Sequence, residues 1–322
     1  PLIPPVKETN SNYMKIDVAS RQSLEITKTL NGQLVGSLLA AINHTLTSGG
    51  SRLLQDRLNC PSINVEEILL RQESVSFFIN NQSVMVKCRE ILKQTPDMQR
   101  SLSRLGLGRG TPKDLSIVRN CLRSIKKIQT LLLDIKTPPN LLNLIKRFEG
   151  FANLLKLLDS ALVEDPPASK KGDIVISSNY NDSLKEFREL KHKAQTFIIN
   201  LQVKYIDLTN VSSLKIKFNN VLGYFIETPI SHSKKMSSDI LSEIFIHRQT
   251  TTNCSRFSSL ELSELASNII NAQEKVDELE HTFLKQLTDS VIKKLYILNS
   301  AAIALSEFDF YSSLSFQSIS ND

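Results

Sequence analysis

Tryptophan is absent from this sequence, and glycine is scarce, with 10 residues among 322. So little glycine favours helix over the many tight turns of a barrel or sandwich. No uninterrupted apolar run approaches the ~20 residues that a membrane-spanning helix needs, and the first ten residues do not have the pattern of a signal peptide. The sequence therefore predicts a mainly α protein that works in the cytoplasm, with no membrane partner.

Cysteine is also sparse, and its spacing excludes two common roles. The four residues, Cys60, Cys88, Cys121 and Cys254, lie far apart and form no CxxC pair. This spacing is typical of small apolar side chains in a reducing compartment, rather than of a disulfide framework or a zinc site. The five histidines show no HExxH, and no GxxxxGK[ST] occurs. We therefore expect no metal, no cofactor and no catalysis within this chain.

Residues 14–135 contain several successive stretches with apolar residues at helical spacing. One stretch covers 33–46. The residues Thr-Ser-Gly-Gly at 47–50 are expected to end it, because paired glycines interrupt helices, and a new helix is expected to begin near Ser51. The sequence thus predicts a body of several short amphipathic helices.

Two further helices carry N-terminal capping signals. Asn64 is a candidate N-cap for a helix over 65–80, in which Leu69 and Phe78 are expected on the core face. Thr111 is followed by proline at the first helical position and aspartate in the first turn, which predicts another helix start.

Two long runs dominate the second half of the chain. After a predicted loop over 164–182, with a short strand at 174–176, residues 182–206 contain neither Gly nor Pro. Residues 260–315 would extend about 80 Å as one helix, so we expect a break or kink inside this run. Its acidic residues, such as Glu280, are interpreted as solvated charges paired along the helix. Two long helices flanking one insertion predict an antiparallel helix pair with the insertion at its tip.

The insertion, residues 192–259, is basic. It holds eight Lys and Arg against four Asp and Glu, a local charge of +4, whereas the whole chain carries +6. A positive charge concentrated in one segment favours a polyanionic partner.

The same insertion has strand-like alternation. Residues 214–218 alternate apolar and basic side chains, 219–220 are typical of a turn, and 223–228 and 245–252 predict two further strands. We expect a small antiparallel sheet. Its aromatic residues are interpreted as sheet core rather than as platforms for stacking bases: Phe218, Tyr224, Phe225, Phe245 and Phe257.

Several segments, in order, resemble landmarks of the MutS DNA mismatch-repair family. They include YMKIDVASRQSLEI, LNGQLVGSLLAAINHTLTSGGSRLLQDRLNCP, RLGLGRGTPKDLSIVRNCL, LKIKFNNVLGYFIET and HRQTTTNCSRF. The resemblance covers nearly the whole chain and implies a multi-helix core, a long helical lever and a small clamp. The implied boundaries are 1–191 with 260–322 for the core and lever, and 192–259 for the clamp.

The resemblance also implies what lies outside the chain. Mismatch reading would precede Pro1, and the ATPase domain, with its ATP and Mg²⁺, would follow Asp322, so the chain is expected to be part of a longer protein. The implied partners are double-stranded DNA, a second subunit of a MutS-like dimer and a MutL-like protein. The implied location is the bacterial cytoplasm, at the nucleoid.

The clamp would supply the contacts to DNA. Matching the family's RQTxxNxxR, the resemblance implies that Arg248, Asn253 and Arg256 meet phosphates, with Gln249 and Thr250 as hydrogen-bonding neighbours. Phosphate contacts position a protein without reading sequence. Further lysines would add positive field: Lys215, Lys217, Lys234 and Lys235.

The match is not complete, and alternatives stay open. Ser258 and Ser259 stand where the family commonly has Thr-Pro, at the return from clamp to lever. One alternative is a MutS-type protein that handles recombination or branched DNA. A solvated basic strand face, or a helical scaffold whose basic tip docks an acidic protein, would give the same charge pattern.

Overall fold

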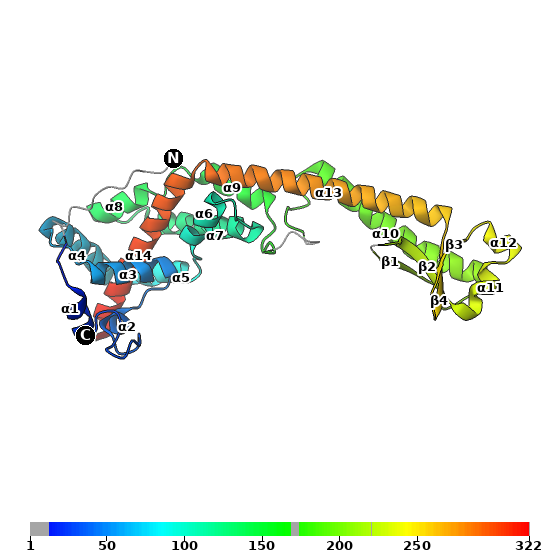
Figure 1. Cartoon of the computed structure of the whole chain (residues 1–322). Coiled ribbons are helices and arrows are strands. Elements are labelled where there is room, and N and C mark those ends of the chain that lie inside the picture. The colour runs from blue at the N-terminus through cyan, green and yellow to red at the C-terminus, as the bar shows by residue number, and fades with distance from the viewer. Residues whose placement is uncertain (1–12, 169–173, 220, 322) are drawn as a thin grey trace. The chain divides into compact units, whose positions relative to one another are not determined.

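The computed structural model describes residues 13–168, 174–219 and 221–321, so the second residue of the predicted 219–220 turn lies outside it. The chain divides into two compact units (Figure 1). The helical unit comprises 1–175 and 286–322, and the sheet unit comprises 176–285. In the described part of the chain, no helix is long and apolar enough to cross a membrane.

The helical unit is built around its last helix, α14 (Leu295–Asn321), which packs against α3, α4, α5, α6 and α8. Phe308 and Tyr311 of α14 are fully buried in this core. The other helices of the unit are α1 (Val18–Ser23), α2 (Leu38–Ile42), α3 (Ser48–Asn59), α4 (Val65–Asn80), α5 (Gln82–Lys93), α6 (Met98–Gly106), α7 (Pro112–Leu132), α8 (Pro139–Lys146) and α9 (Ala152–Ala161).

The predicted helix over 33–46 and the break at 47–50 are wrong. Only α2 forms in the first stretch, because Gly36 has a left-handed φ of 98° and Ser37 caps the short helix. The glycines of the expected break instead lie in the first turn of α3, which begins at Ser48 after its N-cap Thr47. A Cβ on Gly50 would lie 2.2 Å from the Asp309 carboxylate, so glycine is there for the close approach of α3 to α14.

The two capping predictions are confirmed. Asn64 accepts from the first-turn amides of α4, and Thr111 with Asp114 forms a capping box at the start of α7. Phe78 is buried as expected, whereas Leu69 is 57% exposed and does not belong to the core face. Residues 174–176, expected as a short strand, contain only a single bridge residue, Ile176, and the Val163 amide donates to the Val175 carbonyl at 3.1 Å.

The sheet unit joins one four-stranded antiparallel sheet to two long helices. The helices are α10 (Asp182–Thr209) and α13 (Leu260–Ile292), and the strand order is β1-β2-β4-β3. The strands are β1 (Lys215–Asn219), β2 (Gly223–Pro229), β3 (Ile246–Thr250) and β4 (Cys254–Ser258). The connection from β2 to β3 carries η1 (Ile230–His232), α11 (Ser233–Met236) and α12 (Asp239–Ser242).

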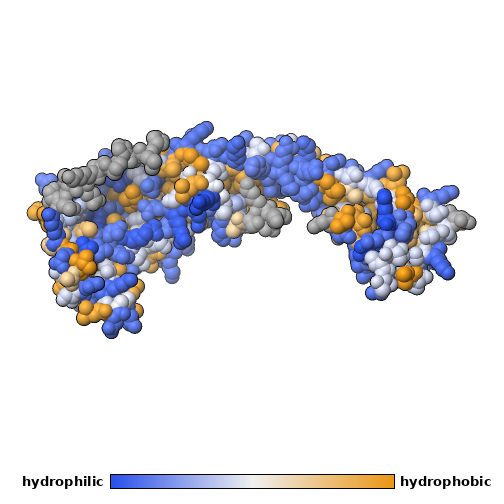
Figure 2. All heavy atoms as spheres, in the orientation of Figure 1, coloured by the Kyte–Doolittle hydropathy of each residue, from blue (hydrophilic) through white to orange (hydrophobic). Residues whose placement is uncertain are grey.

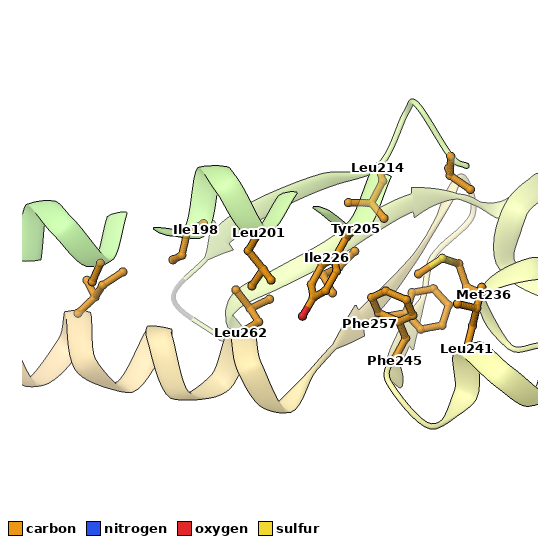
Figure 3. Close-up of a cluster of buried hydrophobic side chains, with 13 residues drawn as sticks. Ile198, Leu201, Tyr205, Leu214, Ile226, Met236, Leu241, Phe245, Phe257 and Leu262 are labelled. Atoms are coloured by element: carbon orange, nitrogen blue, oxygen red, sulfur yellow. The ribbon is translucent and has the colours of Figure 1, made fainter. Parts of the chain in front are cut away.

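One face of this sheet packs onto the helix pair. Ile226 and Phe257 of the sheet, with Leu201 and Tyr205 of α10 and Leu262 of α13, belong to one buried cluster (Figure 3). Phe245 is buried in the same cluster, as expected of sheet core, and Phe225 is also buried, although on the opposite face of the sheet, beneath Arg256. Phe218 is not: it is 56% exposed and contacts the ring of Tyr224.

The long run over 260–315 is broken, as predicted. α13 ends at Ile292 and α14 begins at Leu295. At the break, the Lys294 ammonium donates to the Gly150 carbonyl at 2.8 Å. The two helices therefore form separate elements, of which α14 belongs wholly to the helical unit.

Glu280 of α13 corrects the expectation of solvated charges along this helix. Its carboxylate pairs with Arg188 of α10, and the two side chains are only 13% and 14% exposed. Arg188 also donates to the Ile176 carbonyl and to Ser178. Lys275 and Glu278 do form the expected exposed pair, at i,i+3 spacing.

Candidate nucleic-acid interface

The open face of the sheet collects charged side chains because of the strand register. Lys215 of β1 lies opposite Glu227 of β2, which lies opposite Arg256 of β4, which lies opposite Gln249 of β3. Directly opposed residues of antiparallel strands project to the same side. The other side carries Ile226 and Phe257, which are buried in the core.

On this open face, one side chain from each strand joins a continuous polar row: Lys217, Glu227, Arg256 and Gln249. The Lys217 ammonium donates to Glu227 Oε1 at 2.6 Å, and Arg256 Nε donates to Glu227 Oε2 at 3.4 Å. Arg256 Nη1 donates to Gln249 Oε1 at 2.9 Å. The hydrogen bond from Lys217, more than any other contact, lowers the pKa of the Glu227 carboxyl below its ordinary value.

Arg256 is the most constrained member of the polar row. Its guanidinium lies 4.9 Å from the centre of the Phe225 ring, and this ring is buried beneath it. Cation–π stacking on Phe225 fixes the plane of the Arg256 guanidinium, and the hydrogen bonds to Glu227 and Gln249 fix its orientation in that plane. Arg256 therefore shapes the face of the sheet as well as charging it.

Arg248 lies at an irregularity of β3, where the pairing with β4 shifts between His247 and Gln249. Its side chain is exposed, and within the described residues it makes neither an ion pair nor a hydrogen bond. A bulge of this kind re-aims a side chain at a sheet edge. Arg248 is thus a cation that the fold leaves available.

The other predicted site residues are divided between the sheet and the elements around it. Lys215 is exposed on β1, and Lys234 and Lys235 are exposed on α11, where Lys235 donates to the Asn210 carbonyl. Thr250 projects to the opposite side from Gln249 and bonds to His247. Asn253 lies in the β3–β4 turn, with its carbonyl accepting from the Ile230 amide at 3.2 Å.

Sequence reasoning missed two features of this surface. Strand β4 overlaps the end of the RQTxxNxxR motif and was not predicted as a strand, so its pairing with β2 was not predicted either. Glu227 was counted only as a charge, although an acidic residue opposite a lysine on the neighbouring strand is a recognisable cross-strand signal. Among the described residues, no group of His, Cys, Asp and Glu could hold a metal ion.

Comparison with known proteins assigns the family. A model of MutS domain III matches residues 19–315, which include the four strands and both long helices. The chain belongs to the MutS domain III family. This MutS domain III chain is 42% identical to the DNA mismatch repair protein MutS of Ruegeria pomeroyi over 97% of its length, and 41% identical to that of Paracoccus denitrificans over 96%.

A third MutS relative, from Cereibacter sphaeroides, is 38% identical over the full length of the chain. In each of these relatives the match covers only 35–36% of the protein, so the MutS domain III chain spans about a third of the curated relatives it matches. The resemblance of its motifs to the MutS family is therefore confirmed.

Proposed function

We propose that this chain grips the phosphate backbone of duplex DNA through residues 192–259, without reading base sequence, as part of a MutS mismatch-repair protein. Residues 1–191 and 260–322 would form the core and lever in this proposal. The observation that carries it is the open sheet face, where basic side chains from β1 and β4 flank a single carboxylate, Glu227, and where Arg248 is exposed on the edge strand β3. The relatives, each named DNA mismatch repair protein MutS, support duplex DNA as the polyanion.

The cations differ in their availability to phosphate. Lys215, Lys234 and Arg248 are exposed and, within the described residues, have no side-chain partner. Lys217 and Arg256 are engaged in the polar row. We therefore assign the first phosphate contacts to the free cations, with Lys235, Gln249, Thr250 and Asn253 as neighbours.

The second part of the proposal is mechanical. Ser258 ends β4, Ser259 caps the following helix by accepting from the Leu262 amide at 3.1 Å, and α13 begins at Leu260. The Tyr205 hydroxyl lies 2.7 Å from Ser259 Oγ, which ties this junction to α10. A change in the position of the sheet would pass directly into α13, which continues to Ile292, beyond the sheet unit.

The remaining partners belong to the larger protein that the relatives exemplify. ATP with Mg²⁺, a second subunit and a MutL-like protein would bind mainly through the two thirds of such a protein that this chain does not cover. In this proposal the chain contributes DNA grip and coupling, and contributes no catalytic residue.

Salt dependence tests the DNA assignment. Fluorescence anisotropy of a labelled duplex of arbitrary sequence, over a salt series, should show log K falling with log salt by about 0.9 per phosphate contact. Lys215→Ala and Arg248→Ala should each reduce the steepness of that slope by about 0.9, the contribution of one phosphate contact. Lys275→Ala, on the exposed side of α13, is the matched control and should leave the slope unchanged.

Two outcomes would refute the assignment. One is an affinity for duplex that ignores salt and both substitutions. The other is binding of polyglutamate that is as tight as binding of duplex and equally sensitive to the two substitutions, which would favour an acidic protein as the partner.

A further inference from the structure

Glu227 is the only acidic residue among the paired positions of the four strands, and it lies in the middle of the polar row. It lies opposite both Lys215 and Arg256, and its two oxygens accept separately from Lys217 and Arg256. A carboxylate so placed is surrounded by three of the basic residues proposed to meet DNA.

Carboxylate and phosphate oxygens compete for the same donors. Lysine and arginine give both groups short, charge-assisted hydrogen bonds. Glu227 is 18% exposed in its side chain, against 50% for Lys217, so the carboxylate lies within the surface while the lysine reaches across to it. One of the three N–H donors of Lys217 is therefore taken by the protein's own oxygen, and its charge is paired with Glu227 in place of a phosphate.

We propose that Glu227 is a positioning residue that withholds Lys217 from DNA and fixes Arg256 on the sheet, thereby setting the duplex affinity below what the cations alone would give. The proposal rests on the proposed function, since it needs the open face of the sheet to meet phosphates. It assigns a role to a residue whose charge has the same sign as that of the ligand.

A second glutamate in the sheet unit provides the matched control. Glu261 of α13 pairs with Lys204 of α10, with an Nζ–Oε2 distance of 2.8 Å. The charge change is the same when either glutamate is replaced by glutamine. Glu261, however, lies on the helix pair and, among the residues that the structure describes, has no partner in the sheet.

The test compares Glu227→Gln with Glu261→Gln in the 322-residue chain, by duplex anisotropy over a salt series. If the gain vanishes at 1 M salt, releasing Lys217 to one phosphate should tighten binding about eight-fold at 0.1 M and about three-fold at 0.3 M, because each contact adds about 0.9 to the slope of log K against log salt. Glu261→Gln should leave the slope unchanged.

Lysine substitutions show whether the gain arises from Lys217. Lys217→Ala alone should leave the slope unchanged, because the lysine is withheld from phosphate. In the Glu227→Gln background, Lys217→Ala should reduce the steepness of the slope by about 0.9, which corresponds to one phosphate contact. If circular dichroism shows that Glu227→Gln unfolds the sheet, the test uses the single lysine variants instead. Lys217→Ala must then change the slope less than Lys215→Ala does.

The outcomes separate the two proposals. If the unmodified chain binds duplex with a salt-dependent affinity but Glu227→Gln binds no more tightly than Glu261→Gln, the role of Glu227 is overturned and the proposed function stands. Equal slope losses for Lys217→Ala and Lys215→Ala overturn it as well. If the unmodified chain shows no salt-dependent binding of duplex, the proposed function itself fails.

Discussion

The Arg188–Glu280 pair offers a direct test of what holds the two long helices together. Glu280→Ala leaves Arg188, whose side chain is 14% exposed in the unmodified protein, with only the Ile176 carbonyl and the Ser178 hydroxyl as acceptors among the described residues. Removing one partner of a buried ion pair costs about 3–5 kcal/mol, because the remaining charge is buried without compensation. The two neutral acceptors remain, so we expect the lower end, about 3 kcal/mol.

Hydrogen exchange read by mass spectrometry measures this loss within α13. A cost of about 3 kcal/mol should speed exchange of the 270–285 amides on the order of a hundred-fold, if these amides exchange by opening of the helix pair. Glu278→Ala, which removes a 67% exposed carboxylate from the same helix, is the control and should change nothing measurable.

A double variant completes the design. Arg188→Met with Glu280→Leu replaces the pair by apolar side chains of similar size and should recover most of the lost protection. If Glu280→Ala exchanges no faster than Glu278→Ala, the buried pair does not brace the helices and the reasoning is refuted.

Three further predictions concern local packing. Gly50→Ala should destabilise the helical unit by about 1–3 kcal/mol in urea unfolding, because its Cβ would meet the Asp309 carboxylate; a stabilising effect, as expected of alanine in an unobstructed helix, would contradict the close approach. Ser259→Ala removes the N-cap of α13 and should cost about 1 kcal/mol, seen as faster exchange of the first-turn amides; unchanged exchange would exclude the cap. In the folded chain at pH 8, Cys60 should react with a thiol reagent and Cys88 should not, because burial raises the pKa of Cys88 to about 12; comparable rates would show that its site opens readily.

Local signals predicted much of the fold, and long-range contacts account for most of the errors. The caps at Asn64 and Thr111 act within one helical turn, so the sequence was sufficient to place them. The glycines at 49 and 50 were interpreted as a break because their close neighbours, Ser306 for Gly49 and Asp309 for Gly50, are distant in sequence. Helical spacing alone cannot distinguish a break from a site of close helix contact.

At the candidate site too, local signals predicted some elements and long-range contacts determined the others. Alternation in 214–218 and 223–228 predicted the β1–β2 hairpin, because the strands are neighbours in sequence. The placement of β4 between β2 and β3, and with it the row from Lys217 to Gln249, depends on pairing across the β2–β3 connection. The partner of Glu280 was hidden for a similar reason, since Arg188 lies on the other side of the whole insertion.

The discontinuity of the helical unit has a consequence for synthesis on the ribosome. The partner of Arg57 is Glu307, which is synthesised 250 residues later. The partner of the Thr47 amide is the Asp309 carboxylate, which is synthesised 262 residues later. The sheet unit, by contrast, is one uninterrupted segment that emerges before α14 does. Because domains fold as units during synthesis, the sheet unit can be complete while the helical unit still exposes the surface that α14 will cover. A chain that is terminated shortly before Leu295 and released from the ribosome would therefore be an aggregation-prone body attached to a folded DNA-binding candidate.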